Sequence, residues 1–195
     1  GDETVIAAAV TGGAGLRELN VNYDPYTSSL LKPDPEHETY FYNNGIWDYV
    51  FKDVTRVEEV VMLEGNSLTT LAERHGFALD YVSIDTQGSE FEIISGASEE
   101  LFTDTVAVRT ELSFVPLYQG QKLAEEVMAL LRGRGFFPAS FENFMDWEPN
   151  PAGIGWRGTG FSIHGDVLFF RDITHIVQHS SDPFTTLLKQ AFIAV

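Results

Sequence analysis

The sequence predicts an α/β fold, in which short apolar strands alternate with amphipathic helices. In the segment Leu79–Gly96, an apolar run stops at Asp85, a compact turn follows, and a helical period begins after Ser89. A second apolar run covers residues 105–114, and residues 121–134 carry apolar side chains at helical spacing. A strand that ends in a turn and continues as a helix is typical of an open α/β sheet.

The helix after Ser89 has recognisable start and stop signals. Ser89 can act as the N-cap, and Glu90 and Glu92 lie where the positive end of a helix favours negative charge. Gly96 can close this helix. Asp85 therefore falls at the carboxyl end of a buried strand, which is the edge where open α/β sheets bind ligands. We expect this carboxylate to take part in chemistry.

The chain begins with two segments of strand character. Residues 5–10 form a continuous apolar run that ends at a glycine-rich turn, and residues 16–22 alternate enough to form a second strand. One interpretation is a hairpin at the edge of the sheet. The run Gly12–Gly15 lacks the context of a cofactor loop, because the residues that follow it have no helical period.

The middle of the chain predicts a long loop, a strand and a capped helix. Residues 22–45 are polar and contain prolines and interleaved tyrosines, and a loop of this length is usually functional or disordered. Residues 56–63 have strand character. Ser67 then caps a helix that Gly76 closes.

The strand predicted at residues 105–114 carries Glu111 near its carboxyl end. Two consecutive core strands thus deliver a carboxylate, Asp85 or Glu111, to the same edge of the sheet. Like charges that lie close together raise one pKa, which favours a general base, whereas two carboxylates could instead bind a cation. The alternative is that Glu111 pairs with an arginine or caps a helix.

The second half predicts a core helix at residues 121–134, followed by strands at 136–144 and 161–170. The glycine-rich connection between these strands carries Trp147 and Trp156. These tryptophans can stack on a sugar or another flat ligand, or they can cap the core.

The last segment predicts one more helix. Asp182 followed by Pro183 is a strong helix start, and the helix carries one apolar stripe. This stripe comprises Phe184, Leu187, Leu188, Ala191 and Phe192. The helix therefore either packs on the body of the protein or serves a partner.

Composition excludes several classes of function. The 195 residues include 29 acidic and 12 basic side chains, for a net charge of −17, which argues against binding to nucleic-acid phosphates or an anionic membrane. There is no cysteine, so disulfides and thiolate metal sites are excluded. No apolar run reaches the ~20 residues of a membrane span, and the first residues do not resemble a signal peptide. We expect a cytoplasmic protein that binds no metal.

Four segments of the chain form an ordered set of motifs. They are SIDTQGSEFEIISGA (Ser83–Ala97), RTELSFVPLYQGQ (Arg109–Gln121), a helix that ends in RGRGFFP (Arg132–Pro138), and GDVLFFRD (Gly165–Asp172). In this order they resemble the FkbM family of S-adenosylmethionine-dependent methyltransferases. The resemblance covers residues 5–172.

This resemblance implies a Rossmann-like class I methyltransferase sheet. Residues 1–172 would be the carboxyl-terminal portion of the methyltransferase domain, and residues 173–195 an extension with an amphipathic helix. VIAAAV (Val5–Val10) resembles the third strand of the sheet, near the adenine of the cofactor. In the family, a glycine-rich turn and an acidic residue after the next strand hold the rest of the cofactor. This sequence begins after both, so we expect an N-terminally truncated sheet.

The resemblance also implies roles for individual residues. The expected contacts to S-adenosylmethionine are Ala9, Val10, Ser29, Asp85 and Thr86, of which Ser29 belongs to a Ser-Ser-Leu element of the family. The expected catalytic residues are Asp85, Glu111 and Tyr118. The expected substrate contacts are Gln87, Glu90, Tyr118 and Trp156.

The implied activity is methyl transfer from S-adenosylmethionine to a hydroxyl of a small molecule or a glycan. Asp85 would act as the base or orient the acceptor. One alternative is a non-catalytic binding domain that keeps the fold and uses its last helix as the contact. Another is a hydrolase that holds a metal at the Asp85 edge. A sheet that lacks its first strands would expose an apolar edge, so we also expect a homodimer.

Overall fold

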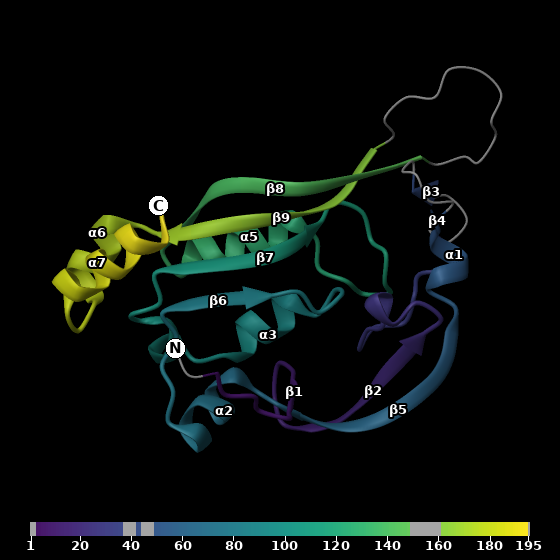
Figure 1. Cartoon of the computed structure of the whole chain (residues 1–195), viewed down its shortest axis with the longest axis horizontal. Coiled ribbons are helices and arrows are strands. Elements are labelled where there is room, and N and C mark those ends of the chain that lie inside the picture. The colour runs from purple at the N-terminus through teal and green to yellow at the C-terminus, as the bar shows by residue number, and fades with distance from the viewer. Residues whose placement is uncertain (1–2, 37–41, 44–48, 149–160, 195) are drawn as a thin grey trace.

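The computed structural model describes residues 3–36, 42–43, 49–148 and 161–194 (Figure 1). Trp156 lies outside these ranges. Within the described part, the strands form two sheets. The larger one has the strand order β4-β3-β8-β9-β7-β6, and the smaller one has the order β1-β5-β2.

The larger sheet combines one parallel pair with antiparallel neighbours. Its strands are β3 (Tyr42–Asn43), β4 (Tyr49–Val50), β6 (Tyr81–Ile84), β7 (Ala107–Ser113), β8 (Phe136–Glu148) and β9 (Phe161–Arg171). β6 runs parallel to β7, whereas β9 lies between β7 and β8 and is antiparallel to both. The predicted α/β class and the four central strands are confirmed by this arrangement.

Two helices cover one face of the larger sheet (Figure 1). They are α3 (Glu90–Gly96) and α5 (Ala124–Gly133), and both contribute buried residues to the main apolar core. The strands alternate as a half-covered sheet requires: Val82 and Ile84 of β6 are buried, whereas Tyr81 is exposed. The opposite face of β7 and β9 carries charged, partly exposed side chains.

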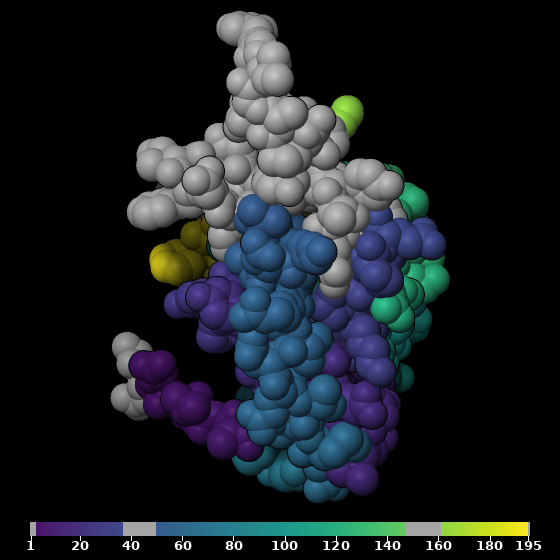
Figure 2. Space-filling view, turned by 90° about the vertical axis from the view of Figure 1, so that its right-hand side faces the viewer, coloured from purple at the N-terminus to yellow at the C-terminus, as the bar shows by residue number. Residues whose placement is uncertain are grey.

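The smaller sheet is a long two-stranded arm with a short third strand. It is built from β1 (Ala9–Val10), β2 (Gly15–Asn22) and β5 (Val57–Asn66). β2 and β5 pair antiparallel along their length, and Figure 2 shows β5 in blue along one face of the molecule. Val60, Val61 and Met62 of β5 are all exposed, so this arm contributes little to the core.

The first apolar run does not join the larger sheet. Only Ala9–Val10 form a strand, and they pair in parallel with Gly65 and Asn66 of β5. The expectation of a hairpin, and that of a third strand in the main sheet, are therefore wrong for this structure. β5 lies between β1 and β2, and β1 pairs only with the last two residues of β5. Gly12–Gly15 connect two strands, which is not the context of a cofactor loop.

In the described part of the chain, β6 is therefore the last strand of the larger sheet. Its second edge pairs with no described strand. Val10 packs against the main core beside α3, although its strand belongs to the smaller sheet.

The remaining helices are short and lie at the periphery. They are the 3₁₀ helix η1 (Pro25–Thr27) and the α-helices α1 (Phe51–Val54), α2 (Leu68–His75), α4 (Glu99–Phe102), α6 (Ile173–His179) and α7 (Pro183–Ile193). The predicted signals of α2 are confirmed. The Ser67 side chain accepts a hydrogen bond from the Thr70 amide, and Gly76 ends the helix in the left-handed conformation with φ 68°.

Two predicted signals of α3 act differently from what we expected. Ser89 makes no side-chain capping bond within the described structure, and its hydroxyl donates back to Thr86. Gly96 does not adopt a left-handed conformation but lies directly against the backbone of Gly12. A Cβ at Gly96 would overlap the carbonyl of Gly12, so close packing explains this glycine.

The carboxyl-terminal helices pack on the body of the protein mainly through polar contacts. Lys189 of α7 forms an ion pair with Asp80 at 2.6 Å, and the Gln190 side chain donates to the backbone carbonyl of Arg171 at 2.6 Å. The predicted apolar stripe faces largely outward, since Phe184, Leu188 and Phe192 are exposed. Among the described residues, no helix has the length and apolar character needed to cross a membrane.

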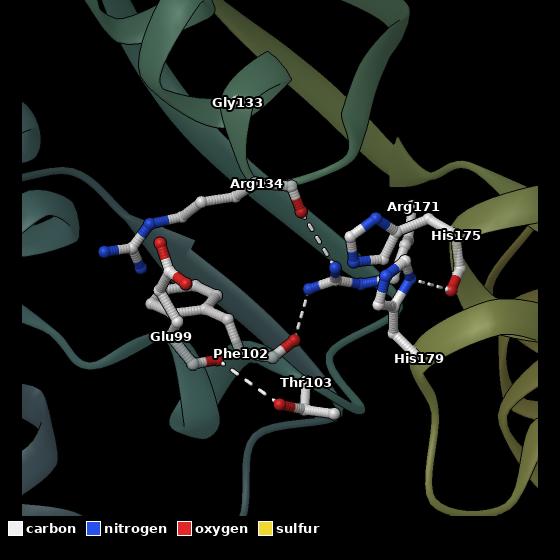
Figure 3. A pocket seen from close by; sticks show the side chains of 8 residues that line it. All are labelled: Glu99, Phe102, Thr103, Gly133, Arg134, Arg171, His175 and His179. Carbon is white, nitrogen blue, oxygen red and sulfur yellow. Dashed lines mark hydrogen bonds between the residues drawn. The ribbon is translucent and has the colours of Figure 1, made fainter.

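Arg171, at the end of β9, connects several elements of the body (Figure 3). Its buried guanidinium donates to the backbone carbonyls of Phe102, Thr105 and Arg134, and it lies over the ring of Phe136 at 4.1 Å. Burial lowers the pKa of Arg171 to about 10. This side chain thus satisfies carbonyls at the ends of α4 and α5 that have no partner within their own helices.

Candidate active site

The parallel pairing of β6 and β7 brings two carboxylates to one edge of the larger sheet. Ile84 pairs with Thr110, so the next residue on each strand, Asp85 or Glu111, emerges at the same level. Ile84 and Thr110 are buried, which places Asp85 and Glu111 on the opposite face of the sheet. The pKa of the Asp85 carboxyl is raised, first because of burial and then because of the negative charge of Glu111.

Glu111 is also paired with a histidine of the neighbouring strand. The Nδ1 atom of His164, on β9, lies 2.9 Å from Oε2 of Glu111. The two side chains are 18% and 14% exposed, so water screens this contact only in part. Burial on its own lowers the pKa of His164. The hydrogen bond and charge of Glu111, with the charges of Asp85 and Asp166, outweigh it, so the pKa of His164 is raised.

A second charge pair lies next to the first one. Arg109 of β7 forms an ion pair with Asp166 of β9 at 2.7 Å, and the Asn143 side chain donates to the same carboxylate at 2.8 Å. Glu142 of β8 lies 3.7 Å from Arg109. Glu111 and Asp166 stand directly opposite each other across the strands, and each has its own partner of opposite charge. The alternative that Glu111 pairs with an arginine is therefore wrong for this structure, since its partner is His164.

The turn after Asp85 is held by a buried carboxylate. A single oxygen of Glu90 accepts hydrogen bonds from the backbone amide and the hydroxyl of Thr86 and from the amide of Gly88. Glu90 is only 5% exposed, and burial is the main reason why its pKa is raised. In this structure Glu90 fixes the turn that presents Asp85.

Gln87 connects the turn to two distant segments. Its backbone has φ 53°, a conformation that non-glycine residues adopt rarely and at a cost. Its side-chain amide donates to Asp85 at 2.9 Å and accepts from the Tyr118 hydroxyl at 3.3 Å. Its carbonyl accepts from the Ser29 hydroxyl at 2.6 Å. The structure thus brings Ser29, Asp85, Gln87 and Tyr118 together.

Tyr118 and Ser29 are both buried, and their polar groups point at protein atoms. The Tyr118 hydroxyl donates to the backbone carbonyl of Thr27 at 2.8 Å as well as to Gln87. These contacts attach the segments around η1 and after β7 to the Asp85 turn. Ser29 and Tyr118 therefore hold the turn after Asp85 in place through these hydrogen bonds.

The other residues predicted to contact the cofactor or the substrate are spread over several parts of the chain. Ala9 and Val10 belong to β1 in the smaller sheet, and Trp156 is outside the described ranges. Thr86 lies in the turn next to Asp85, where its amide and hydroxyl are bound by Glu90. No group of three or more metal-ligating side chains occurs in the described residues.

Sequence reasoning did not assign a role to His164 or Arg109, which complete the charged face. A signal for His164 was present. Along β9 the buried residues Ile163, Gly165 and Val167 alternate with polar or partly exposed ones, which places His164 and Asp166 on the face of Glu111. What the sequence could not show was that β9 lies directly beside β7.

This arrangement can perform two kinds of chemistry. The carboxylates of Asp85, Glu111 and Asp166 attract a cationic group. His164, oriented by Glu111, and Asp85, oriented by Gln87, are groups that can accept a proton. Asp85 follows the carboxyl end of β6, and His164 pairs with Ser113 at the carboxyl end of β7, which is the edge where α/β folds bind their ligands.

Comparison with known proteins agrees with this placement. The model of the methyltransferase FkbM domain matches residues 2–138, which include β6, the Asp85 turn and β7. The segment with His164 and Asp166 lies beyond the matched range. No curated protein and no solved structure matches the chain. Because the family model covers more than half of the sequence, the chain belongs to the FkbM methyltransferase family.

Proposed function

We propose that this protein transfers a methyl group from S-adenosylmethionine to a hydroxyl group of a small molecule or a glycan. The observation that carries the proposal is the pair of carboxylates, Asp85 and Glu111, at the carboxyl edge of two parallel strands in a methyltransferase family member. A hydroxyl is a poor nucleophile, and a base at this edge would make it a better one.

The negatively charged side chains at this edge fit a cationic cofactor. S-adenosylmethionine carries a positive sulfonium, and the Asp85 carboxylate lies near the negative charges of Glu111 and Asp166, which together favour a cation nearby. Asp85 and Thr86 are the residues of the described structure that would hold it. When bound, S-adenosylmethionine supplies a methyl group that the positive charge on sulfur already makes reactive.

The residues of the chain then have to align the acceptor and remove its proton. Gln87 holds Asp85 in one orientation through a 2.9 Å hydrogen bond, and Glu90 fixes the turn that carries both. Such fixed positioning lowers the entropic part of the barrier for a displacement at carbon. Glu111 and His164 add a second acid–base pair beside Asp85.

A methyl-transfer assay on an acceptor panel tests the proposal. The full-length product of the gene would be incubated with S-adenosylmethionine labelled in the methyl group. The panel would contain aliphatic alcohols, phenols and sugars, each beside its amine counterpart. We expect label in a hydroxyl product and an equal amount of S-adenosylhomocysteine. Label only in amines would contradict O-methylation. Cofactor binding without transfer to any acceptor would favour a non-catalytic binding domain.

A further inference from the structure

We propose that the cavity between α4, α5 and α6 is a binding site for a phosphate group, either free phosphate or the phosphate of a small molecule. The cavity has a volume of about 370 Å³, and its charged lining consists of Glu99, Arg134, Arg171, His175 and His179. Small-molecule sites usually have volumes of ~300–1,000 Å³, so the cavity has room for such a ligand. The proposal does not depend on methyl transfer.

The cavity lies at the edge of the larger sheet opposite to the candidate active site. Arg171 pairs with Phe136, the first residue of β8, and its neighbour Phe170 pairs with Ala107, the first residue of β7. Asp85 and Glu111 stand at the other ends of β6 and β7. A ligand in this cavity would therefore be a different molecule from the methyl acceptor.

Positive charge gathers around this cavity although the chain is strongly acidic. The sequence has 29 acidic and only 12 basic side chains, yet two arginines and two histidines line the cavity. Within the described ranges, Glu99 is the one acidic side chain of the lining. Neither Arg134 nor Arg171 forms an ion pair with a described residue, and their hydrogen bonds go to neutral backbone carbonyls. An anion in the cavity would supply the missing negative charge.

The nearby carboxylates compensate this charge only in part. Glu99 favours the charged form of Arg134, but burial outweighs it and lowers the pKa of Arg134. Asp104 acts in the same way on Arg171, whose pKa is nevertheless lowered to about 10. The Asp104 carboxylate is also engaged by the Ser180 hydroxyl at 2.6 Å. Both arginines therefore pay for burial without a full counter-charge.

His175 senses the positive charge of this cluster. Its pKa is lowered, first by burial and then by the positive charges of Arg171 and His179. Asp172, the N-cap of α6, favours the charged ring but does not outweigh them. An anion beside His175 would reverse this effect and raise the pKa of the ring.

The two histidines have ring nitrogens left for a ligand. The Nδ1 atom of His179 lies 3.0 Å from the carbonyl oxygen of His175, and a carbonyl can only accept a hydrogen bond. Nδ1 of His179 therefore carries a proton, and its Nε2 remains for another partner. The ring nitrogens of His175 make no hydrogen bond to a described residue. The two rings stack with 4.3 Å between their centroids, so they present their nitrogens together.

Arg134 contributes a donor that lacks an acceptor. Its Nη2 atom donates to the carbonyl of Ala97 at 2.7 Å, whereas its buried Nη1 atom has no hydrogen-bond partner among the described residues. A buried N–H group without an acceptor is unfavourable. Rotation of the guanidinium toward the cavity would give Nη1 an oxygen of the bound anion, and guanidinium groups are well suited to phosphate.

A phosphate group matches this lining better than a carboxylate does. It carries a charge of about −1.5 to −2 at neutral pH and offers three acceptor oxygens. Figure 3 shows Glu99 and Arg134 on one side of the cavity and the two histidines on the other. The bound phosphate would thus connect α6 to the body of the protein. Because such a ligand binds only the folded chain, it should also raise the melting temperature.

The first test is calorimetric titration of the full-length gene product with inorganic phosphate, phenyl phosphate and sodium chloride at constant ionic strength. We expect saturable binding of the two phosphates with a Kd of about 1 mM or below, and none of chloride. The double variant His175→Gln/His179→Gln should bind at least about tenfold more weakly. His75→Gln is the control, because His75 is exposed on α2 and does not line the cavity. Tighter binding of phenyl phosphate would identify an organic ligand, and equal binding free phosphate.

The second test uses a variant that should bind more tightly. Glu99→Gln removes the acidic side chain of the lining, so its affinity for phosphate should rise about threefold. A damaged fold cannot produce such a gain. Arg134→Gln should weaken binding, and its folding is checked by circular dichroism.

The third test follows the histidine rings by NMR. Sulfate stays doubly charged over the whole range from about pH 8 to about pH 6, in which histidines gain their protons. It should raise the titration midpoints of His175 and His179 and leave that of His75 unchanged. By the same linkage, sulfate should bind more tightly at the lower pH.

Three outcomes would each overturn the proposal. They are binding no stronger than that of chloride, an unchanged affinity in the double histidine variant, and an affinity that falls in Glu99→Gln. None of these measurements uses methyl transfer, so failure of this site would leave the proposed function untouched.

Discussion

The carboxylate of Glu90 accepts hydrogen bonds from the backbone amide and the hydroxyl of Thr86, at 2.9 Å and 3.0 Å. The first residue of α3 thereby fixes the turn that ends β6 and presents Asp85. The same oxygen also accepts from the amide of Gly88 at 3.1 Å. Glu90 thus holds the turn before the helix, whereas Ser89 makes no side-chain capping bond in the described structure.

This relationship gives a prediction for Glu90. Glu90→Ala should lower the free energy of unfolding by about 2–4 kcal/mol, because it leaves the part-buried amide of Thr86 and the buried amide of Gly88 without an acceptor. Glu90→Gln should cost less than about 1 kcal/mol, since one amide oxygen can accept the same bonds and no charge is buried. Urea unfolding measures both. Equal losses in the two variants would show that the hydrogen bonds are not the cause.

Arg171 gives a prediction about the core. Arg171→Lys should destabilise the protein by about 3 kcal/mol or more, because a single ammonium cannot reach the carbonyls of Phe102, Thr105 and Arg134. Arg132→Lys is the matched control, since Arg132 is exposed in the last turn of α5. Thermal unfolding followed by circular dichroism compares the two. A loss in Arg171→Lys as small as in the control would contradict the role of this side chain.

Two helical glycines should respond to alanine in opposite directions. Gly96→Ala should destabilise by about 2 kcal/mol or more, because the new methyl group overlaps the backbone of Gly12. Gly133→Ala should stabilise by about 0.5 kcal/mol, because a Cβ there meets no described atom within 4 Å and alanine favours the helix. Urea midpoints of the two variants decide this. Stabilisation by both substitutions would mean that Gly12 does not pack on α3.

His175 gives a pH dependence of stability. Its pKa is lowered by burial, and then by the positive charges of Arg171 and His179. The unfolded chain therefore takes up more protons, and stability should fall as the pH drops from about 6.5 through the lower folded pKa. When the pH is lowered from 7.5 to 5.5, the free energy of unfolding of His175→Gln should fall by less than that of the wild type. Thermal unfolding at both pH values measures this difference, and equal losses would contradict it.

Local structure was predictable from the sequence wherever neighbouring residues determine it. The apolar run before Asp85, the Ser67 cap and the left-handed Gly76 all depend on a few adjacent residues, and the structure confirms each of them. The pairing of β6 with β7 followed from two consecutive core strands, and it brings Asp85 and Glu111 to one edge.

Features that depend on distant segments were not predictable in the same way. The apolar run of residues 5–10 could pair with any strand, and it pairs with the end of β5 instead of joining the main sheet. His164 reaches Glu111 only because β9 lies beside β7. The outward stripe of α7 follows from the polar contacts of Lys189 and Gln190, which periodicity does not reveal.

The most direct test of the proposed active site is calorimetric titration of the full-length gene product with S-adenosylmethionine and with S-adenosylhomocysteine. Wild type should bind both compounds. Asp85→Asn should weaken binding of S-adenosylmethionine about tenfold, which corresponds to roughly 1.4 kcal/mol, because it removes the charge that faces the sulfonium. The same substitution should weaken binding of the neutral product, S-adenosylhomocysteine, by less than about threefold. If neither compound binds to the wild type, or if Asp85→Asn weakens both equally, Asp85 does not face the charge of the cofactor.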